Sequence, residues 1–526
     1  MITLAGVTPV ALGRTAGALL LSMVVALGQP LHLLGAAPQE ASIGANVRVP
    51  PYDGPFRFGI NFGFRQGWNN QGLATASAEA GATSARIKLP EWLFQRYGYD
   101  SEYRNGNFPR YREVGLNDLT AFLIGPTPDH STAPEQKNTE LYSPRNLYEP
   151  IWSAPGVVNP ENYWASYVYQ AVTTYRADVR IWEIWNEPDY TRWWDLTQRD
   201  WWERPPAADE LPYWNDSVFA YIRLLRVSYE VIKAVDPDAL VATGGLGYES
   251  FLHAVLRYTD NPADGSLTED FPARGGAYFD VLSFHYYPAY ATQDLATKQW
   301  YRDTDSDSAV DAFATKVRNL RSQLLDFGYD GQTYPEKLWI CTETGVASKP
   351  IEKSAGGPDL MRNYLAKLPI MAQASGVKQV HWFLLTDQEP ADAASNSYRH
   401  MGLYYDLQQV KPGEQVMKPS ALGYLTASRL LSGRTLDRAA GEALGLLPQV
   451  RGYVFRDGSG RPTYVLWART TGSQEAASAD VTLAVEGPVD RYEVAAGPAA
   501  PVERLTPAGG TIRLTLTGAP TFLVGQ

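Results

Sequence analysis

The chain has 526 residues, a formal net charge of −11 and a sequence pI of about 5.2. This length exceeds one ordinary globular core, so we expect at least two domains. The acidic charge repels phosphate groups, which argues against nucleic acid and anionic membrane surfaces as partners. The single cysteine, Cys341, excludes an intramolecular disulfide and a cysteine-based metal site. The 6 histidines show no close metal-ligand spacing, so neither a metal nor another cofactor is predicted.

The N-terminus predicts a targeting segment. The apolar run AGALLLSMVVALG at 16–28 follows Arg14 and precedes small residues at 35–37. This order is typical of a secretory signal peptide. A membrane anchor is the alternative, but polar residues interrupt the run before it reaches the roughly 20 apolar residues that a span needs. We therefore predict a secreted or cell-surface protein, with a signal peptide at 1–37 and a linker at 38–55.

Residues 56–433 alternate between short apolar runs and segments with helical periodicity. The runs that predict strands are FRFGINF, SARIKLP, LTAFLIG, VRIWEIWNEP, LVATGGLG, FDVLSFHYYP, KLWICTETG and VHWFLL. Strands that alternate with helices and are apolar on both faces are typical of a covered parallel sheet. The number of units favours an α/β fold of the (β/α)8 TIM-barrel type with long insertions. A doubly wound open sheet is the alternative, but no GxGxxG turn follows the first strand.

The pattern changes after Gly433. Residues 434–526 contain short strand-like runs separated by glycine, proline and aspartate, among them PTYVLWAR and TIRLTLTG. Such spacing is typical of a small all-β module. We therefore expect a C-terminal β-sandwich domain after the barrel.

Polar residues gather where four of the predicted barrel strands end. In a barrel, the carboxyl ends of the strands form the active-site face, so polar groups there are candidates for catalysis. The groups are Asn186-Glu187-Pro188, His285-Tyr286-Tyr287-Pro288, Thr342-Glu343-Thr344-Gly345 and Trp382 with Thr386-Asp387. Two carboxylates, Glu187 and Glu343, thus end the fourth and seventh strands at matching height.

Two facing carboxylates suit the cleavage of a glycosidic bond. One carboxyl group must be protonated to give its proton to the leaving oxygen, while the other must be ionised to attack or to activate water. This chemistry predicts an O-glycosyl hydrolase whose partner is an oligo- or polysaccharide.

The segments IWEIWNEPD, SFHYYP and WICTETG resemble clan A of the glycoside hydrolases. The run SGVKQVHWFLLTDQ with the later MGLYYD and KPSALGYLTASRLLSG is most similar to family 39 and related bacterial polysaccharide-degrading enzymes. The resemblance covers about residues 56–526. It implies a retaining enzyme with the acid/base on the fourth strand and the nucleophile on the seventh.

Carried over to this sequence, the resemblance makes Glu187 the general acid/base and Glu343 the nucleophile. It further implies substrate-site roles for Asn186 (a sugar hydroxyl), Tyr287 (orienting Glu343), His285 (lining the site), Trp382 (a platform under the sugar ring) and Arg86 (pairing with the nucleophile). His130, in GPTPDHS after the third strand, is a further candidate sugar contact.

Two features have alternative interpretations. Glu183 is expected deeper in the barrel than Glu187, on the same strand face, as a structural partner of a cation such as Arg86 or Lys88. Arg86 is therefore a candidate ion-pair partner of both Glu183 and Glu343. The aromatic insertion at 190–214 carries a cluster of tryptophans that suits sugar stacking as well as core packing: Trp193, Trp194, Trp201, Trp202 and Trp214.

The leading prediction is a secreted retaining glycosidase. The alternatives are a carbohydrate-binding or scaffold protein on an inactive barrel, a transglycosylase that uses the same residues, and a membrane-anchored form if the N-terminal segment is retained.

Overall fold

The computed structural model describes residues 48–191, 201, 203–288, 292–293, 300–301, 305–351, 354–472 and 474–526. The predicted signal peptide lies outside these residues. Within them, no helix combines the length and the apolar character that crossing a membrane requires.

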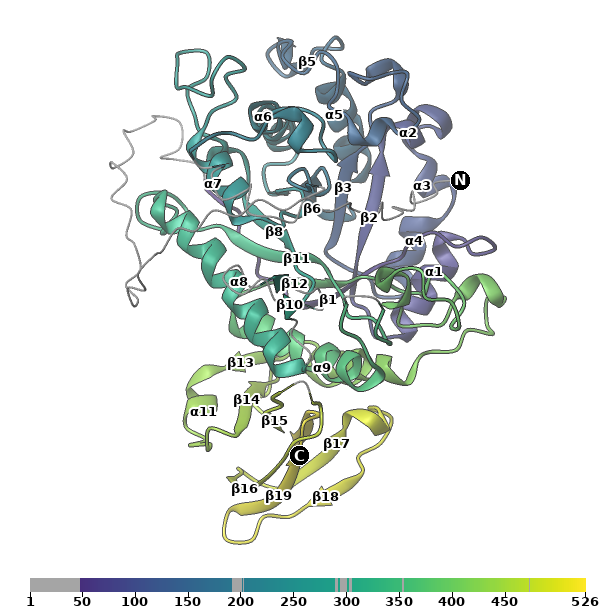
Figure 1. The fold of residues 1–526 in the computed structure, drawn as a ribbon, viewed down its shortest axis with the longest axis vertical. Coiled ribbons are helices and arrows are strands. Elements are labelled where there is room, and N and C mark those ends of the chain that lie inside the picture. The colour runs from purple at the N-terminus through teal and green to yellow at the C-terminus, as the bar shows by residue number, and fades with distance from the viewer. Residues whose placement is uncertain are drawn as a thin grey trace, which may run out of the picture. The chain divides into compact units, whose positions relative to one another are not determined.

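Eight parallel strands close into a barrel in the order β1-β12-β11-β8-β7-β6-β3-β2 (Figure 1). The predicted (β/α)8 fold is therefore confirmed. The strands are β1 (Arg57–Asn61), β2 (Ser84–Pro90), β3 (Leu119–Ile124), β6 (Val179–Ile184), β7 (Leu240–Ala242), β8 (Val281–His285), β11 (Leu338–Thr344) and β12 (Gln379–Trp382). They are nearly all buried because helices cover the outer face of the barrel and side chains fill its interior.

Helices connect the strands and surround the barrel (Figure 1). The link between β2 and β3, where helical periodicity is weak, contains three short helices instead of one long one. The helices are α1 (Asn70–Glu79), α2 (Glu91–Tyr97), α3 (Ser101–Arg104), α4 (Asn107–Glu113), α5 (Tyr163–Tyr175), α6 (Val218–Val235), α7 (Glu249–Arg257), α8 (Ser306–Asp326), α9 (Pro358–Ala374) and α10 (Leu422–Leu431). Antiparallel pairs in the loops join β4 (Trp152–Ala154) to β5 (Val157–Val158) and β9 (Thr292–Gln293) to β10 (Trp300–Tyr301).

The predicted linker is partly built into the barrel. Tyr52 is buried and packs against inward-facing residues of β6, β7, β8 and β11. Its hydroxyl donates to Asp118 Oδ2 at 3.3 Å, and Gln379 Nε2 donates to that hydroxyl at 3.3 Å. Tyr52 therefore fills the interior of the barrel at the amino ends of these strands, and the assignment of 38–55 as a linker stays a prediction.

The chain ends in antiparallel sheets, as predicted for a β-sandwich (Figure 1, yellow-green). One sheet has the order β13-β14-β15-β20-β17-β18, and β16 pairs with β19 beside it. The elements are β13 (Thr435–Asp437), α11 (Arg438–Glu442), β14 (Val450–Arg456), β15 (Pro462–Ala468), β16 (Ser478–Ala484), β17 (Val489–Glu493), β18 (Glu503–Leu505), β19 (Thr511–Thr517) and β20 (Thr521–Gly525).

The β-sandwich packs on α8 and α9 through buried polar contacts. Asp307 at the start of α8 accepts hydrogen bonds from Lys367 Nζ at 2.8 Å and from Trp467 Nε1 at 2.9 Å. Glu475 accepts from Asn363 Nδ2 of α9 at 2.6 Å. These bonds satisfy charges that would otherwise be costly to bury, so the two domains share one interface core.

Candidate active site

Glu187 reaches the mouth of the barrel through an unusual backbone path. Strand β6 ends at Ile184, earlier than the predicted strand over 179–188. Trp185 and Glu187 then adopt left-handed conformations, with φ of 77° and 49°. The backbone N–H of Glu187 donates to the carbonyl oxygen of Gly244, a residue shortly after β7, at 2.6 Å. The argument from strand alternation therefore does not extend to Glu187; this local, energetically strained turn places its carboxylate instead.

Glu343 lies on β11 where the strand register is irregular. The pairing with both neighbouring strands shifts after Cys341, and Glu343 comes to lie opposite His285 of β8. Both carboxylate oxygens are occupied: Oε1 accepts from Arg86 Nη1 at 2.6 Å, and Oε2 accepts from the Tyr287 hydroxyl at 2.6 Å. The predicted contacts of Arg86 and Tyr287 with Glu343 are thus present.

These contacts favour the ionised form of Glu343. Burial raises the pKa of this carboxyl, but the charges of His285 and Arg86 and the hydrogen bond from Tyr287 outweigh burial, so the net pKa is lowered. Burial and the charge of Glu343 also raise the pKa of Tyr287 well above its usual range, which keeps the phenol a donor.

His285 connects the two glutamates. Its Nδ1 lies 2.8 Å from Glu187 Oε1 and 3.8 Å from Glu343 Oε2. Its Nε2 lies 3.0 Å from Thr342 Oγ1. Burial lowers the pKa of His285, but Glu343 and Glu187 raise it by more, and the net pKa is raised. The ring fits because Gly245, with φ of 67°, has no Cβ; a Cβ there would lie 2.2 Å from His285 Nε2.

Glu183 is the buried anchor of this network. Its Oε2 accepts from Arg86 Nε at 2.6 Å, and its Oε1 accepts from Ser283 Oγ and from Thr342 Oγ1, each at 2.7 Å. The predicted structural pairing is confirmed with Arg86. Arg86 makes both of the predicted ion pairs, because its guanidinium uses separate nitrogens for Glu183 and Glu343.

The donor directions in this network fix the tautomer of His285. Glu183 Oε1 accepts from Thr342 Oγ1, so Thr342 uses its single hydroxyl proton on Glu183. Thr342 Oγ1 then accepts from His285, whose Nε2 must carry a hydrogen. The remaining nitrogen, Nδ1, faces Glu187. One proton is therefore shared across the Glu187–His285 contact, either on the carboxyl or on the imidazole.

The same three side chains offer the atoms of a possible cation site. One atom each from Glu187, His285 and Glu343 lies within 4.8 Å of the others. Both oxygens of Glu343 already accept strong hydrogen bonds from Arg86 and Tyr287, so a cation would compete with a permanent guanidinium charge. The arrangement fits a paired-carboxylate catalyst better than a metal centre.

The remaining predicted residues have different surroundings. Asn186 Oδ1 accepts from Arg86 Nη2 at 2.7 Å, so its side chain is joined to the same network, and its contact with a sugar hydroxyl stays a prediction. Trp382 is buried, at 1% exposure, and its Nε1 donates to Met401 O at 2.7 Å. A ring covered this completely has no face for a sugar, so the platform prediction for Trp382 is wrong. The next residue, Phe383, is half-buried and packs edge-on against Tyr287, with ring centroids 6.1 Å apart.

His130 is held away from these contacts by partners of its own. Its Nδ1 lies 2.6 Å from Glu91 Oε1, and its ring stacks on Tyr163 with centroids 4.0 Å apart. These contacts fix the loop after β3, and a sugar contact by His130 stays a prediction. In the aromatic insertion, Trp201 and Trp214 are core residues, at 1% and 0% exposure. Trp193, Trp194 and Trp202 lie outside the described residues.

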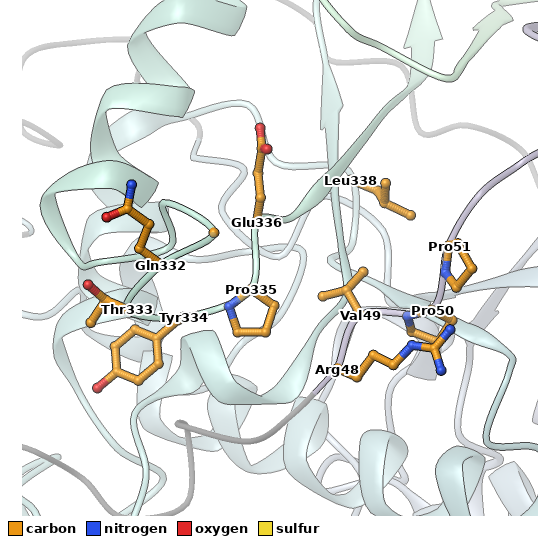
Figure 2. A pocket seen from close by; sticks show the side chains of 11 residues that line it. Arg48, Val49, Pro50, Pro51, Gln332, Thr333, Tyr334, Pro335, Glu336 and Leu338 are labelled. Atoms are coloured by element: carbon orange, nitrogen blue, oxygen red, sulfur yellow. The ribbon is translucent and has the colours of Figure 1, made fainter.

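A hollow of about 510 Å³ lies elsewhere on the molecule. Figure 2 shows residues 48–51 on one side of it and residues 332–336 on the other. Its lining includes Leu338, the first residue of β11, whereas Glu343 lies near the last. The hollow therefore belongs to the amino end of the barrel, opposite the catalytic candidates.

No protein-family model and no curated protein matches the sequence of the chain. Its structure is similar to a family 39 glycoside hydrolase from Bacteroides cellulosilyticus WH2, with 17% identity, a TM-score of 0.56 and coverage of 90% of this chain and 81% of that one. A family 30 endoxylanase from Clostridium papyrosolvens C71 has 12% identity, a TM-score of 0.53 and coverage of 91% and 98%. An α-L-arabinofuranosidase from Thermotoga maritima has 10% identity, a TM-score of 0.51 and coverage of 89% and 96%. At these identities the similarity shows the fold alone, and this fold is the one that the resemblance in the sequence implied.

Proposed function

We propose that the protein is a retaining glycoside hydrolase that cleaves an O-glycosidic bond of an oligo- or polysaccharide. One observation carries the proposal: Glu187 just after the fourth barrel strand and Glu343 on the seventh converge on His285, with one oxygen of each glutamate within 4.8 Å of the other. This closeness favours double displacement, for which the carboxyl groups lie about 5–5.5 Å apart, over inversion, which needs about 6.5–9.5 Å.

In the first step, ionised Glu343 attacks the anomeric carbon while Glu187 gives its proton to the leaving glycosidic oxygen. The C–O bond of the substrate breaks, and a glycosyl ester forms on Glu343. In the second step, Glu187 removes a proton from water as the water oxygen attacks the same carbon. The ester bond breaks, Glu343 leaves as a carboxylate, and Glu187 is protonated again.

The surroundings suit these roles. Arg86 and Tyr287 hold Glu343 in the ionised form that attack requires. Glu187 is the more exposed of the two side chains, at 25% against 13%, so it can meet both a leaving group and a water. Asn186 is held by Arg86, the residue that also pairs with the nucleophile, and Phe383 has a half-buried ring beside Tyr287.

The test is chemical rescue of alanine variants on aryl β-glycosides and bacterial exopolysaccharides. Glu343→Ala should lose turnover and, with azide, form a glycosyl azide of inverted configuration. Glu187→Ala should form a glycosyl azide of retained configuration from substrates with activated leaving groups. Glu336→Ala, an exposed carboxylate at the other end of β11, is the matched control. Full activity of Glu343→Ala would end the nucleophile assignment, and an inverted product from the wild type would end the retaining mechanism.

Export is part of the same proposal, because a polysaccharide substrate is met outside the cell. It is supported by the apolar run at 16–28 preceded by Arg14. Sequencing the N-terminus of the mature protein tests it. A start near residues 36–41 supports cleavage, whereas an intact Met1 in the membrane fraction indicates an anchor.

A further inference from the structure

Lys88 points into the barrel beside the catalytic network. Arg86 and Lys88 are two residues apart on β2, so their side chains leave the strand on the same face. That face is the barrel interior, because Arg86 contacts Glu183 and Glu343 across it. Lys88 lies nearer the carboxyl end of β2, and its side chain is 35% exposed, against 1% for Arg86. An inward side chain with this exposure can only face the open mouth of the barrel.

The ammonium group of Lys88 pairs with Glu140, and Glu140 is in turn held by Trp92 of α2. Glu140, in the insertion after β3, accepts from Lys88 Nζ at 2.6 Å through Oε2 and from Trp92 Nε1 at 2.6 Å through Oε1. Gly125 lets these groups approach, because a Cβ there would lie 3.1 Å from Glu140 Cγ and 3.2 Å from Trp92 Cδ1. Three segments of the chain thus converge on one Lys–Glu pair at the mouth of the barrel.

We propose that Lys88 and Glu140 form a sugar-binding subsite on the glycone side of the cleavage point; this inference rests on the proposed function. The side follows from Arg86, which contacts the nucleophile and lies one alternation step below Lys88. In double displacement the glycone is the part that becomes attached to the nucleophile.

The ligand chemistry follows from the pair itself. An ammonium has three donors, and Glu140 takes one of them, while a carboxylate has acceptor capacity beyond its two bonds here. Adjacent sugar hydroxyls can therefore accept from Lys88 and donate to Glu140. Because the two charges neutralise each other, the subsite selects a neutral sugar with neighbouring hydroxyls over one with a carboxylate or sulfate at that place.

A substrate-and-enzyme double comparison tests the subsite. The best aryl glycoside of a panel is identified with the wild type, and its deoxy analogues are then measured with wild type, Lys88→Met and Glu140→Gln. Lys137→Met, an exposed lysine of the same insertion, is the matched control. We expect kcat/KM to fall about 10- to 100-fold in Lys88→Met, the loss for one hydrogen bond to a charged group.

The deoxy analogues distinguish direct sugar binding by Lys88 from a role in which Lys88 only holds the loop of Glu140 in place. One deoxy analogue lacks the hydroxyl that Lys88 binds. The wild type should have a lower kcat/KM on this analogue than on the parent glycoside. Lys88→Met should have the same kcat/KM on both. If Lys88→Met keeps full discrimination at every hydroxyl, or has wild-type kcat/KM, the subsite is refuted while the proposed function stands. If the wild type turns over no glycoside or polysaccharide of the panel, the proposed function itself fails and the subsite with it.

Discussion

Arg86 Nη1 lies 2.6 Å from Glu343 Oε1, and the arginine side chain that makes this contact is only 1% exposed. A buried guanidinium stays charged, so it acts as a permanent counterion for the carboxylate. Phe122 supports it from below, with its ring centroid 4.1 Å from the guanidinium carbon. Among the protein groups that lower the pKa of Glu343, His285 has the largest effect, and the charge of Arg86 comes next.

Arg86→Met should therefore move the acid side of the pH profile. Burial alone raises the pKa of Glu343, and Arg86 helps to lower it. Without Arg86 the pKa of Glu343 rises. The acid limb of the kcat/KM profile should therefore shift to higher pH. The exposed Arg96→Met serves as control and should leave the profile unchanged. An unshifted acid limb in Arg86→Met would contradict this electrostatic role.

Glu183→Gln should destabilise the barrel. Arg86 and Glu183 are 1% and 0% exposed, and removing one partner of such a pair leaves a buried charge with a weaker partner, at a cost of about 3–5 kcal/mol. Urea unfolding measures the loss in the free energy of unfolding. Glu113→Gln removes half of an exposed ion pair with Arg110 and should cost at most about 1 kcal/mol. Equal losses in the two variants would show that Glu183 is not a buried anchor.

Thr342→Val should shift the alkaline limb of the kcat/KM profile to lower pH. The wild-type enzyme needs the proton shared by Glu187 and His285, and the pKa of His285 is raised, so the alkaline limb of kcat/KM should lie above pH of about 6.5. Valine removes the acceptor for His285 Nε2–H and disfavours the imidazolium. Nitrogen NMR should also show the Nε2–H tautomer in the wild type. Thr120→Val, another buried threonine inside the barrel, is the control; an Nδ1–H tautomer would refute the assigned donor directions.

The strand pattern of the sequence was sufficient to predict the barrel and to place Glu343 on β11, whereas Glu187 lies just after β6 and not within it. Apolar runs such as LWICTET are long enough to identify strands, and their order along the chain is the order of the barrel. The paired carboxylates could be predicted for the same reason, because the ends of parallel strands meet on one face.

Other features depend on contacts between distant segments, which local patterns do not encode. The left-handed Trp185 and Glu187 occur within a run that has the composition of a strand, and their amides donate to distant residues, Leu123 and Gly244 respectively. The aromatic ring beside Tyr287 belongs to Phe383, whereas Trp382 is buried and donates its Nε1–H to Met401 O. The sequence carries one signal of this packing, the pair Gly244-Gly245 after β7. A residue without a Cβ is needed at Gly245 to leave room for the ring of His285.

Asp307→Asn should weaken the contact between the barrel and the β-sandwich. Asp307 and Lys367 are 2% and 0% exposed, so losing the carboxylate leaves a buried ammonium and should cost about 3–5 kcal/mol in urea unfolding. Burial raises the pKa of Asp307, but Lys367 and several hydrogen bonds lower it by more. Its stabilisation is therefore present above the unfolded pKa of about 3.9 and is lost as pH falls through the lower folded value. Asp311→Asn, on the same helix but 41% exposed, should cost less; an equal cost would contradict the buried role of Asp307.

Gly245→Ala should disable catalysis while the barrel still folds. Gly245 has φ of 67°, and a Cβ would lie 2.2 Å from His285 Nε2, so the ring must move away from Glu187 and Thr342. A displacement of about 1 Å near the reacting groups costs roughly 10²-fold in rate, and the loss should appear in kcat. Gly247→Ala is the matched control, because its Cβ would meet nothing closer than Asp189 Oδ2 at 3.9 Å. Circular dichroism checks the fold of both variants, and a Gly245→Ala enzyme with wild-type kcat would show that the position of His285 does not govern the reaction.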